Sequence, residues 1–228
     1  MDRLSGVLRS RGHAEDLPEA AQLRREVLRY RVDTFGLTHP ETLRAMNNLG
    51  TVLMEQEDWA EAEIAFKNVI PMFATRNDEF GFGNPTVLLG ALLTEQQRYD
   101  EAEDFFRKGI AWRESFFGKE HPLTLSAIRK CTRMLVESES YDSALPMLED
   151  CSDRHNKAAG SAAGATFGVR QSFSRTLIGL GRLDAAESFL QETATLMRTN
   201  RGVRHPYTRT AAKQLDDFRR NNDLSGDE

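Results

Sequence analysis

Apolar residues recur at intervals of three and four positions along most of this 228-residue chain. That spacing places them on one face of an α-helix, which turns once every ~3.6 residues. From Pro40 onward, one such face consists of Leu43, Met46, Leu49, Leu53 and Met54. The polar run 56–58 interrupts it, and a second apolar face near Trp59 consists of Ala62, Phe66, Val69, Ile70 and Phe73. The pattern predicts two amphipathic helices joined by a short turn, and an all-α fold.

A bulky residue followed three positions later by alanine marks the start of the second helix. This marker recurs at Leu17 and Ala20, Trp59 and Ala62, Tyr99 and Ala102, Tyr141 and Ala144, and Leu183 and Ala186, with steps of 42, 40, 42 and 42 between the bulky residues. A second marker, a glycine followed by His-Pro, recurs at Gly36, His39 and Pro40, at Gly118, His121 and Pro122, and at Gly202, His205 and Pro206. Such self-similarity predicts antiparallel helix pairs stacked into an α-solenoid, because one pair cannot bury its apolar faces alone.

The two markers divide the chain into a single solenoid over residues 1–220. Its five units are expected at about 1–36, 37–80, 81–118, 119–160 and 161–202, followed by a capping helix at 205–220 and a disordered tail at 221–228. The first helix of the first unit is expected to carry Leu4, Val7 and Leu8. Pro71 is expected to kink or shorten its helix, and the small-residue stretch 158–166 to form a flexible joint.

Composition changes this picture little. A net charge of -5 and a pI near 5.7 argue against nucleic acid or anionic membrane as the main partner, although local exceptions to this average remain open. No apolar run approaches the ~20 residues of a transmembrane helix, and the N-terminus lacks the pattern of a signal peptide. We therefore expect a cytoplasmic protein. Cys131 and Cys151 have no metal-type spacing and are expected to be reduced, buried thiols.

A search for catalytic chemistry predicts no enzyme, no cofactor and no metal site. His39, His121 and His205 stand where they would cap helices, and His13 and His155 have no carboxylate or cysteine arranged around them in sequence. The glycine-rich stretches 81–85 and 160–166 lack the Lys-Ser/Thr of a phosphate loop. Acidic pairs near the starts of the second helices, such as Glu61 and Glu63, are typical of solvated charges that interact favourably with the helix dipole.

The repeat resembles the tetratricopeptide repeat in its Leu49-Gly50 and Leu89-Gly90 pairs, its aromatic residues Trp59, Tyr99 and Tyr141, its five alanines, and Phe66 and Phe106. The period of 40 to 42 residues is similar to that of the variant found in kinesin light chains. The chain departs from the pattern at Cys131-Thr132 and at Phe173-Ser174, where Leu-Gly is expected. The resemblance implies a right-handed superhelix whose first helices line a concave groove.

The resemblance also implies which side chains face a ligand in that groove: Asn47, Thr51, Val87, Ala91, Arg129, Arg133, Gln171 and Arg175. Arg129 and Arg133 are four residues apart and should lie side by side, with Arg175 one helix pair away. Asn47 would hold a peptide backbone, and Val87 and Ala91 would form an apolar floor. Arginines pair with carboxylates through two hydrogen bonds, so the groove predicts a peptide with acidic side chains or a C-terminal carboxylate. The alternative is an ordinary solvated arginine face.

Three functions remain open on the sequence alone. The first is a non-enzymatic scaffold or adaptor that binds an extended, acidic protein or peptide segment. The second is a regulatory arm of a larger signalling enzyme such as a kinase or protease, and the start inside a helical pattern at Met1 favours a fragment or a partner-capped end. The third is an RNA-binding helical repeat that uses Arg129, Lys130, Arg133, Arg170 and Arg175. The acidic total charge and the lack of interleaved aromatic residues count against the third.

Overall fold

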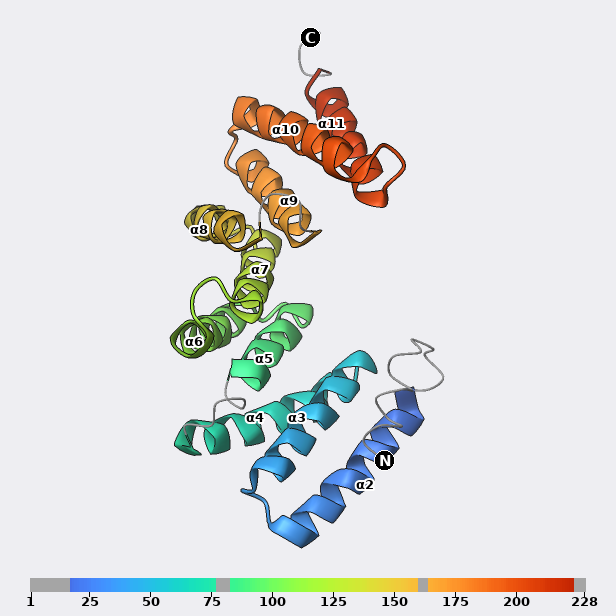
Figure 1. Ribbon diagram of the computed structural model, residues 1–228, viewed down its shortest axis with the longest axis vertical. Coiled ribbons are helices and arrows are strands. Elements are labelled where there is room, and N and C mark those ends of the chain that lie inside the picture. The colour runs from blue at the N-terminus through green and yellow to red at the C-terminus, as the bar shows by residue number, and fades with distance from the viewer. Residues whose placement is uncertain (1–16, 77–82, 160–163, 224–228) are drawn as a thin grey trace. The chain divides into compact units, whose positions relative to one another are not determined.

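The computed structural model describes residues 17–76, 83–159 and 164–223, which contain ten α-helices and no strand. The helices are α2 (Leu17–Phe35), α3 (Pro40–Glu55), α4 (Trp59–Arg76), α5 (Gly83–Glu95), α6 (Tyr99–Phe117), α7 (Pro122–Glu137), α8 (Tyr141–Ala159), α9 (Gly164–Gly179), α10 (Leu183–Arg201) and α11 (Pro206–Asp223). Figure 1 shows them in chain order. The predicted all-α class and the predicted helix pairs are confirmed.

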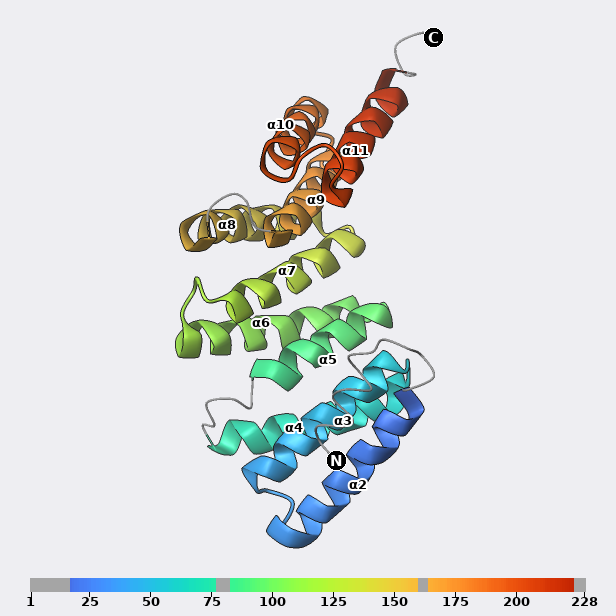
Figure 2. The same cartoon turned by 45° about the vertical axis from the view of Figure 1, so that its right-hand side comes forward.

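The stack of repeats divides into two larger compact units, called here the first unit (Met1–Phe116) and the second unit (Phe117–Glu228). In the first unit, α3 packs between α2 and α4 and also contacts α5. In the second unit, α7, α8, α9, α10 and α11 each pack on the next, and α7 also contacts α9. Figures 1 and 2 show this layering from two directions. Each unit is therefore an α-solenoid in which first helices, such as α7 and α9, also meet each other.

The His-Pro sequences begin first helices, as predicted. His39 precedes α3 with extended backbone (φ -68°, ψ 140°), and its Nδ1 accepts a hydrogen bond from the Glu41 N–H at 3.2 Å. The Nδ1 atoms of His121 and His205 accept equivalent bonds from the N–H groups of Leu123 and Tyr207, also at 3.2 Å. Each imidazole thus satisfies one N–H group that the first helical turn leaves unpaired. The capping role predicted for these three histidines is confirmed.

The turns between first and second helices share one conformation. Glu57, Gln97, Glu139 and Gly181 all have φ between 57° and 70°, in the left-handed region. The residue after each donates its backbone N–H to a carbonyl five residues back, as Asp58 does to Leu53 at 2.9 Å. This hydrogen bond and the left-handed residue define a Schellman motif, which ends the first helix and reverses the chain. Only the last of the four turns has glycine at that position.

Close packing between paired helices explains the Leu-Gly sequences. A Cβ atom added at Gly50 would lie 2.8 Å from Cε1 of Phe66, and one added at Gly90 would lie 3.1 Å from Cγ of Phe106. In the second unit the positions equivalent to Gly50 hold Thr132 and Ser174, and those equivalent to Phe66 hold Leu148 and Leu190; all four residues are buried. Where the first helix carries a larger residue, the second helix carries a smaller one, so the two departures from the repeat compensate.

Several predicted details differ from the structure. Helix α4 is not shortened at Pro71 but continues to Arg76 with the proline exposed. Residues of the predicted joint at 158–166 belong to the end of α8 and the start of α9, and 160–163 lie outside the described residues. Helix α11 continues past the predicted end at residue 220 to Asp223, and Nδ2 of Asn222 donates to the Phe218 carbonyl at 2.8 Å in its last turn. The predicted helix at Leu4, Val7 and Leu8 also lies outside the described residues.

Candidate binding site

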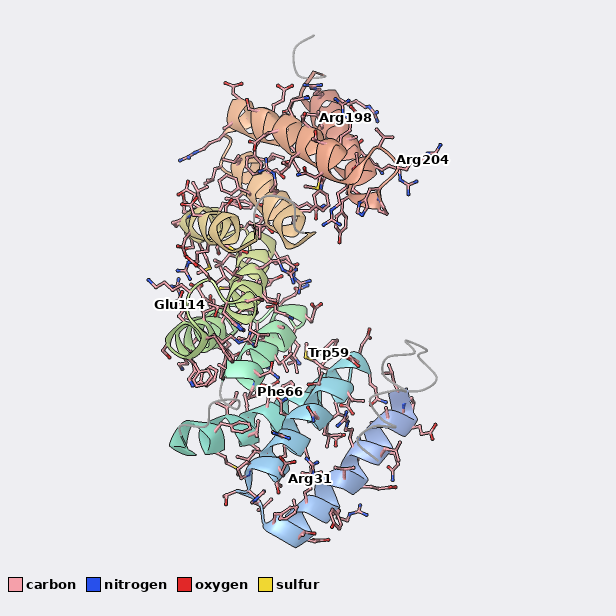
Figure 3. The ribbon with its side chains drawn as sticks, in the orientation of Figure 1. Arg31, Trp59, Phe66, Glu114, Arg198 and Arg204 are labelled. Carbon is pink, nitrogen blue, oxygen red and sulfur yellow. The ribbon has the colours of Figure 1, made fainter. Side chains whose placement is uncertain are left out.

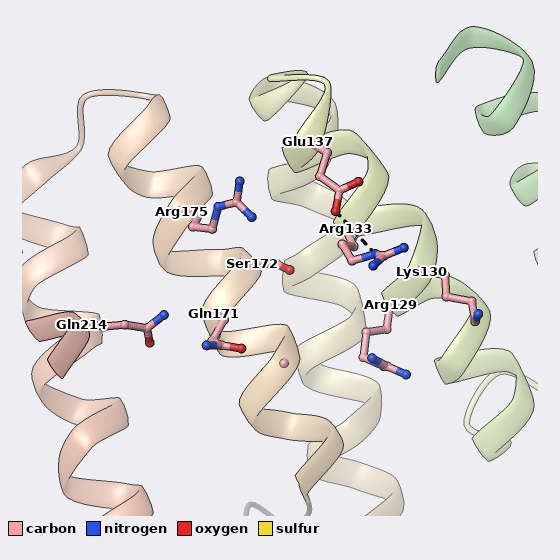
Figure 4. A pocket seen from close by; sticks show the side chains of 9 residues that line it. Arg129, Lys130, Arg133, Glu137, Gln171, Ser172, Arg175 and Gln214 are labelled. Atoms are coloured by element: carbon pink, nitrogen blue, oxygen red, sulfur yellow. Dashed lines mark ion pairs between the residues drawn. The ribbon is translucent and has the colours of Figure 1, made fainter. Parts of the chain in front are cut away.

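A basic pocket of about 450 Å³ lies in the second unit, on the side lined by the first helices. Helix α7 contributes four side chains, α9 three side chains and a glycine, and α11 one side chain (Figure 4). The lining residues are Arg129, Lys130, Arg133, Glu137, Gly168, Gln171, Ser172, Arg175 and Gln214. Four of the eight residues predicted for the groove, Arg129, Arg133, Gln171 and Arg175, therefore lie together in this pocket.

Helix α7 supplies an ordered row of charges. Arg129, Arg133 and Glu137 are spaced by four residues, so they stand one above another on a single helix face. Nε of Arg133 lies 3.6 Å from Oε1 of Glu137, and their side chains are 49% and 33% exposed. At that distance and exposure the contact is a weak, solvent-screened ion pair. Half of the Arg133 side chain is exposed, so it can also contact an external carboxylate.

Arg129 and Arg175 form no ion pair with any residue that the structure describes. The Arg129 side chain lies across α9 at Gly168, where an added Cβ would be 3.7 Å from Cδ and 3.9 Å from Nη1 of the arginine. Arg175 is exposed on α9, and its guanidinium is directed toward the space between α7 and α9 in Figure 4. With Lys130 the pocket holds four cationic side chains against the single carboxylate of Glu137. Its electrostatic character suits an anion.

Neutral hydrogen-bonding groups complete the pocket. Ser172 is nearly buried at 9% exposure, while Gln171 and Gln214 are partly exposed. A glutamine amide offers both donors and an acceptor, so it can bond either group of a peptide backbone. The pocket therefore combines cationic groups for an acidic side chain with amides for a main chain.

Arg170, one of the residues named for the RNA-binding alternative, does not line this pocket. It is 8% exposed, its Nε donates to Oγ1 of Thr193 at 2.7 Å, and its Nη2 lies 3.0 Å from Oε1 of Glu192. Its guanidinium carbon also lies 4.2 Å from the centre of the Phe189 ring. These contacts hold Arg170 between α9 and α10, so its predicted place on a nucleic-acid-binding surface is wrong.

The predicted groove residues of the first unit lie on α3 and α5. Oγ1 of Thr51 donates to the Asn47 carbonyl at 3.0 Å, and the buried Oδ1 of Asn47 has no hydrogen-bond partner among the described residues. Val87 and Ala91 are 1% and 4% exposed, so α5 offers little apolar surface at these positions. The basic pocket includes none of these four residues.

The sequence prediction omitted five residues of the pocket: Lys130, Glu137, Gly168, Ser172 and Gln214. Extending the repeat into the last helix would have found Gln214, which follows Gln171 by 43 positions, close to one period. Glu137 follows Arg133 by one helical turn and could have been found on the same helix face. Lys130 and Ser172 carry no such signal, because only the packing of α7 on α9 brings them to the pocket.

The cysteines and possible metal ligands of the described residues form no reactive or metal-binding site. Cys131 and Cys151 are buried thiols outside any disulfide, as predicted, and burial raises the pKa of the Cys151 thiol to about 12, so this thiol is protonated at neutral pH. Across the described ranges, no group of three or more His, Cys, Asp or Glu residues could hold a metal ion. None of the described helices is long and apolar enough to cross a membrane.

Solved structures share this fold at low sequence identity. A putative kinesin light chain from Podosopora anserina with nearly identical TPR-like repeats superposes with a TM-score of 0.76 at 16% identity, over 86% of this chain and 94% of that one. BtubC (BKLC) from P. vanneervenii gives 0.64 at 14% identity, over 99% and 80%. A Rap protein complexed with Competence and Sporulation Factor gives 0.56 at 12% identity, over 95% and 60%.

The sequence itself also identifies the family. No curated protein sequence matches this chain significantly. The family model described as tetratricopeptide repeat matches residues 10–74 and 84–157, which is more than half of the chain. Together with the stacked helix pairs and the kinesin-light-chain-like structural neighbours, this match shows that the chain belongs to the tetratricopeptide repeat family.

Proposed function

We propose that this protein is a non-catalytic interaction module that binds an extended, acidic peptide segment of a partner protein. The observation that carries the proposal is the pocket in the second unit, where Arg129 and Arg175 face solvent-accessible space without a described ion-pair partner. Tetratricopeptide repeats form protein-interaction scaffolds, and the pocket adds a chemical preference to that general role.

Charge and geometry together support an acidic ligand. A guanidinium presents a planar set of N–H donors that matches a carboxylate, and a hydrogen bond between charged groups contributes ~1.5–3 kcal/mol. Arg129 and Arg133 stand one turn apart on α7, and Arg175 approaches from α9, so the groups can contact successive carboxylates of an extended chain. Gln171 and Gln214 would bond its backbone. The Rap protein complexed with Competence and Sporulation Factor offers a precedent for ligand binding by a related fold.

In the first unit, Asn47 is the proposed backbone-binding residue. Its Oδ1 lacks a hydrogen-bond partner among the described residues, and a buried polar atom without a partner is unfavourable. A peptide N–H group reached by a rotation of the Asn47 amide would satisfy it. Thr51 is proposed to lie along the same ligand path within that unit, whereas the burial of Val87 and Ala91 leaves little surface there for a ligand.

Fluorescence anisotropy with a labelled glutamate-rich peptide tests the proposal. The variant Arg129→Ser, Arg133→Ser, Arg175→Ser should lose about 100-fold or more in affinity, because three charge-assisted hydrogen bonds disappear. The matched control Arg44→Ser, Arg107→Ser, Lys108→Ser removes three exposed, ion-paired cations and should bind within about threefold of the natural chain. A glutamine-substituted peptide and a C-terminally amidated peptide separate side-chain from terminal carboxylate recognition. Unchanged affinity of the first variant, with an unchanged Tm, would overturn the proposal.

Glu137 provides a second test in the opposite direction. Oε1 of Glu137 lies 3.6 Å from Nε of Arg133, so the Glu137 carboxylate competes with a ligand carboxylate for this arginine. Glu137→Gln should therefore strengthen binding of the acidic peptide by about threefold to tenfold at low salt. Weaker binding by this variant would show that Glu137 orients Arg133 for the ligand, and would contradict the competition.

A further inference from the structure

We propose that the turn between α10 and α11 is a peripheral binding surface for membranes that carry anionic lipids. The surface, called here the basic turn, consists of Arg198, Arg201, Val203, Arg204 and Arg209. It is independent of the acidic-peptide pocket, since none of these residues lines that pocket.

The basic turn lies within a long stretch of the second unit that lacks acidic residues. No Asp or Glu stands between Glu192 and Asp216, although the chain as a whole has a net charge of -5. All four arginines of the turn are exposed. Figure 3 labels Arg198 near the end of α10 and Arg204 in the turn, with the Arg204 side chain pointing away from the helices. The N-terminus of α11, which is the positive end of its helix dipole, adds to the positive potential of these arginines.

The fold does not require these positive charges. The same turn, a glycine with positive φ followed by a capping histidine, also occurs at Gly118 and His121, where φ is 96° against 80° at Gly202. At that turn the positions equivalent to Arg198 and Arg204 hold Glu114 and Glu120, 84 residues earlier in each case. The same turn structure therefore forms with acidic residues at these two positions as well as with basic ones. The reversal at the basic turn points to a role outside the turn itself.

Three of the four arginines are also available to an external partner. Arg198, Arg204 and Arg209 form no ion pair with any described residue, whereas cations elsewhere on the surface do, as Arg107 with Glu103 and Arg219 with Glu187. A phosphate group can accept hydrogen bonds from a guanidinium in the same paired geometry as a carboxylate. Several phosphates on a flat, negative surface can therefore contact the basic turn at once.

The apolar groups of the turn favour a membrane over a nucleic acid. Val203, between Arg201 and Arg204, is 66% exposed, and an aliphatic side chain flanked by cations suits the headgroup boundary of a bilayer. Single-stranded nucleic acid needs exposed aromatic faces for base stacking. The Tyr207 ring is 38% exposed, but one of its faces stacks on Phe167 at 4.8 Å. His205 caps α11 and lies edge-on to Tyr207. The rings near the turn are thus already engaged within the protein.

Vesicle co-sedimentation of the full chain tests the proposal. Vesicles of phosphatidylcholine with about 30% phosphatidylserine should bind the chain at least about tenfold more strongly than phosphatidylcholine alone, and the difference should shrink with added salt. Arg198→Glu with Arg204→Glu, which copies the charges of the turn at Gly118, should reduce binding to background. Val203→Ser should reduce it about twofold to threefold.

Two controls make the outcome decisive. Arg107→Glu with Lys108→Glu changes the net charge by the same amount on α6 of the first unit, and should retain at least about half of the binding. The pocket variant at Arg129, Arg133 and Arg175 should also retain vesicle binding. Equal binding to both vesicle types, or equal loss in the Arg107 and Lys108 control, would overturn the proposal. Binding of a single-stranded RNA probe that needs Arg198 and Arg204, without vesicle binding, would replace the membrane with nucleic acid.

Discussion

The ion-paired arginines of the first unit and the pocket arginines of the second unit differ in their partners. In the first unit, Nη2 of Arg25 on α2 lies 2.6 Å from Oε2 of Glu61 on α4, and Nη1 of Arg98 lies 2.8 Å from Oε2 of Glu63. The first pair joins two helices, and the second joins α4 to the turn that precedes α6. In the second unit, Arg129 and Arg175 line a pocket without a described ion-pair partner. The comparison shows that an arginine in this repeat becomes structural where a neighbouring helix offers a carboxylate, and becomes available to a ligand where none does.

The units also pack their helix pairs differently. The first unit places a large aromatic ring against glycine, with Phe66 beside Gly50, whereas the equivalent positions of the second unit hold Thr132 and Leu148. Both arrangements are fully buried, so total volume at the crossing matters more than the identity of either residue. This explains how the fourth and fifth repeats, at about 119–160 and 161–202, keep the fold without the Leu-Gly sequence.

The largest expected effect comes from exchanging the packing pair. Gly50→Thr should destabilise the protein by about 2–3 kcal/mol, because an added Cβ would lie 2.8 Å from the buried Phe66 ring. Phe66→Leu alone should cost about 1–2 kcal/mol through the space it leaves. The double variant reproduces the Thr132 and Leu148 pair. Its loss in free energy of unfolding, measured with urea, should be smaller than the sum of the two single losses by at least about 1 kcal/mol. Strictly additive losses would show that the two positions do not compensate.

A smaller effect distinguishes structural from available charges. Desolvation opposes ionisation of Glu63, but hydrogen bonds from Lys67 and Arg98 outweigh it and lower the pKa of its carboxyl group below the usual 4.5. Because the folded pKa is the lower one, this contribution is complete above about pH 5 and is lost as pH falls through the folded value. Glu63→Gln should cost about 1 kcal/mol at pH 7 and almost nothing near pH 3.

Arg175→Ser is the matched comparison for Glu63→Gln. It removes an exposed cation that forms no ion pair with a described residue, so it should change stability by less than about 0.5 kcal/mol at either pH. Thermal unfolding at both pH values measures the two variants side by side. A pH-independent loss in Glu63→Gln, or a large loss in Arg175→Ser, would contradict the division between structural and available charges.

The smallest expected effect lies in the turns that both units share. Glu57→Gly and Glu139→Gly should each raise stability by about 0.5–1 kcal/mol, since φ near 60° is costly for a residue with a Cβ atom. Gly181→Ala should lower it by about 1 kcal/mol for the same reason. Glu149→Gly, on the exposed middle of α8, is the control and should be destabilising. The direction of the change in Tm of each variant tests this prediction.

The sequence by itself determined the helix pairs, their starts and their order. The period of about 42 residues, the His-Pro caps and the bulky residue before each alanine are local signals, and they act within one or two helical turns. For this reason Pro40, Trp59, Tyr99 and Pro122 begin helices where the pattern predicts. The family resemblance and the groove positions of the second unit followed from the same repeat register.

Only the tertiary structure decided what each charged side chain contacts. Arg170 and Arg175 stand on the same helix, yet the first is buried against Thr193 and Phe189 while the second lines the pocket. Lys130 and Ser172 entered the site for the same reason, because the packing of α7 on α9 brings them there. Contacts between helices depend on crossing geometry and on the volumes packed between them, and no short stretch of sequence encodes either.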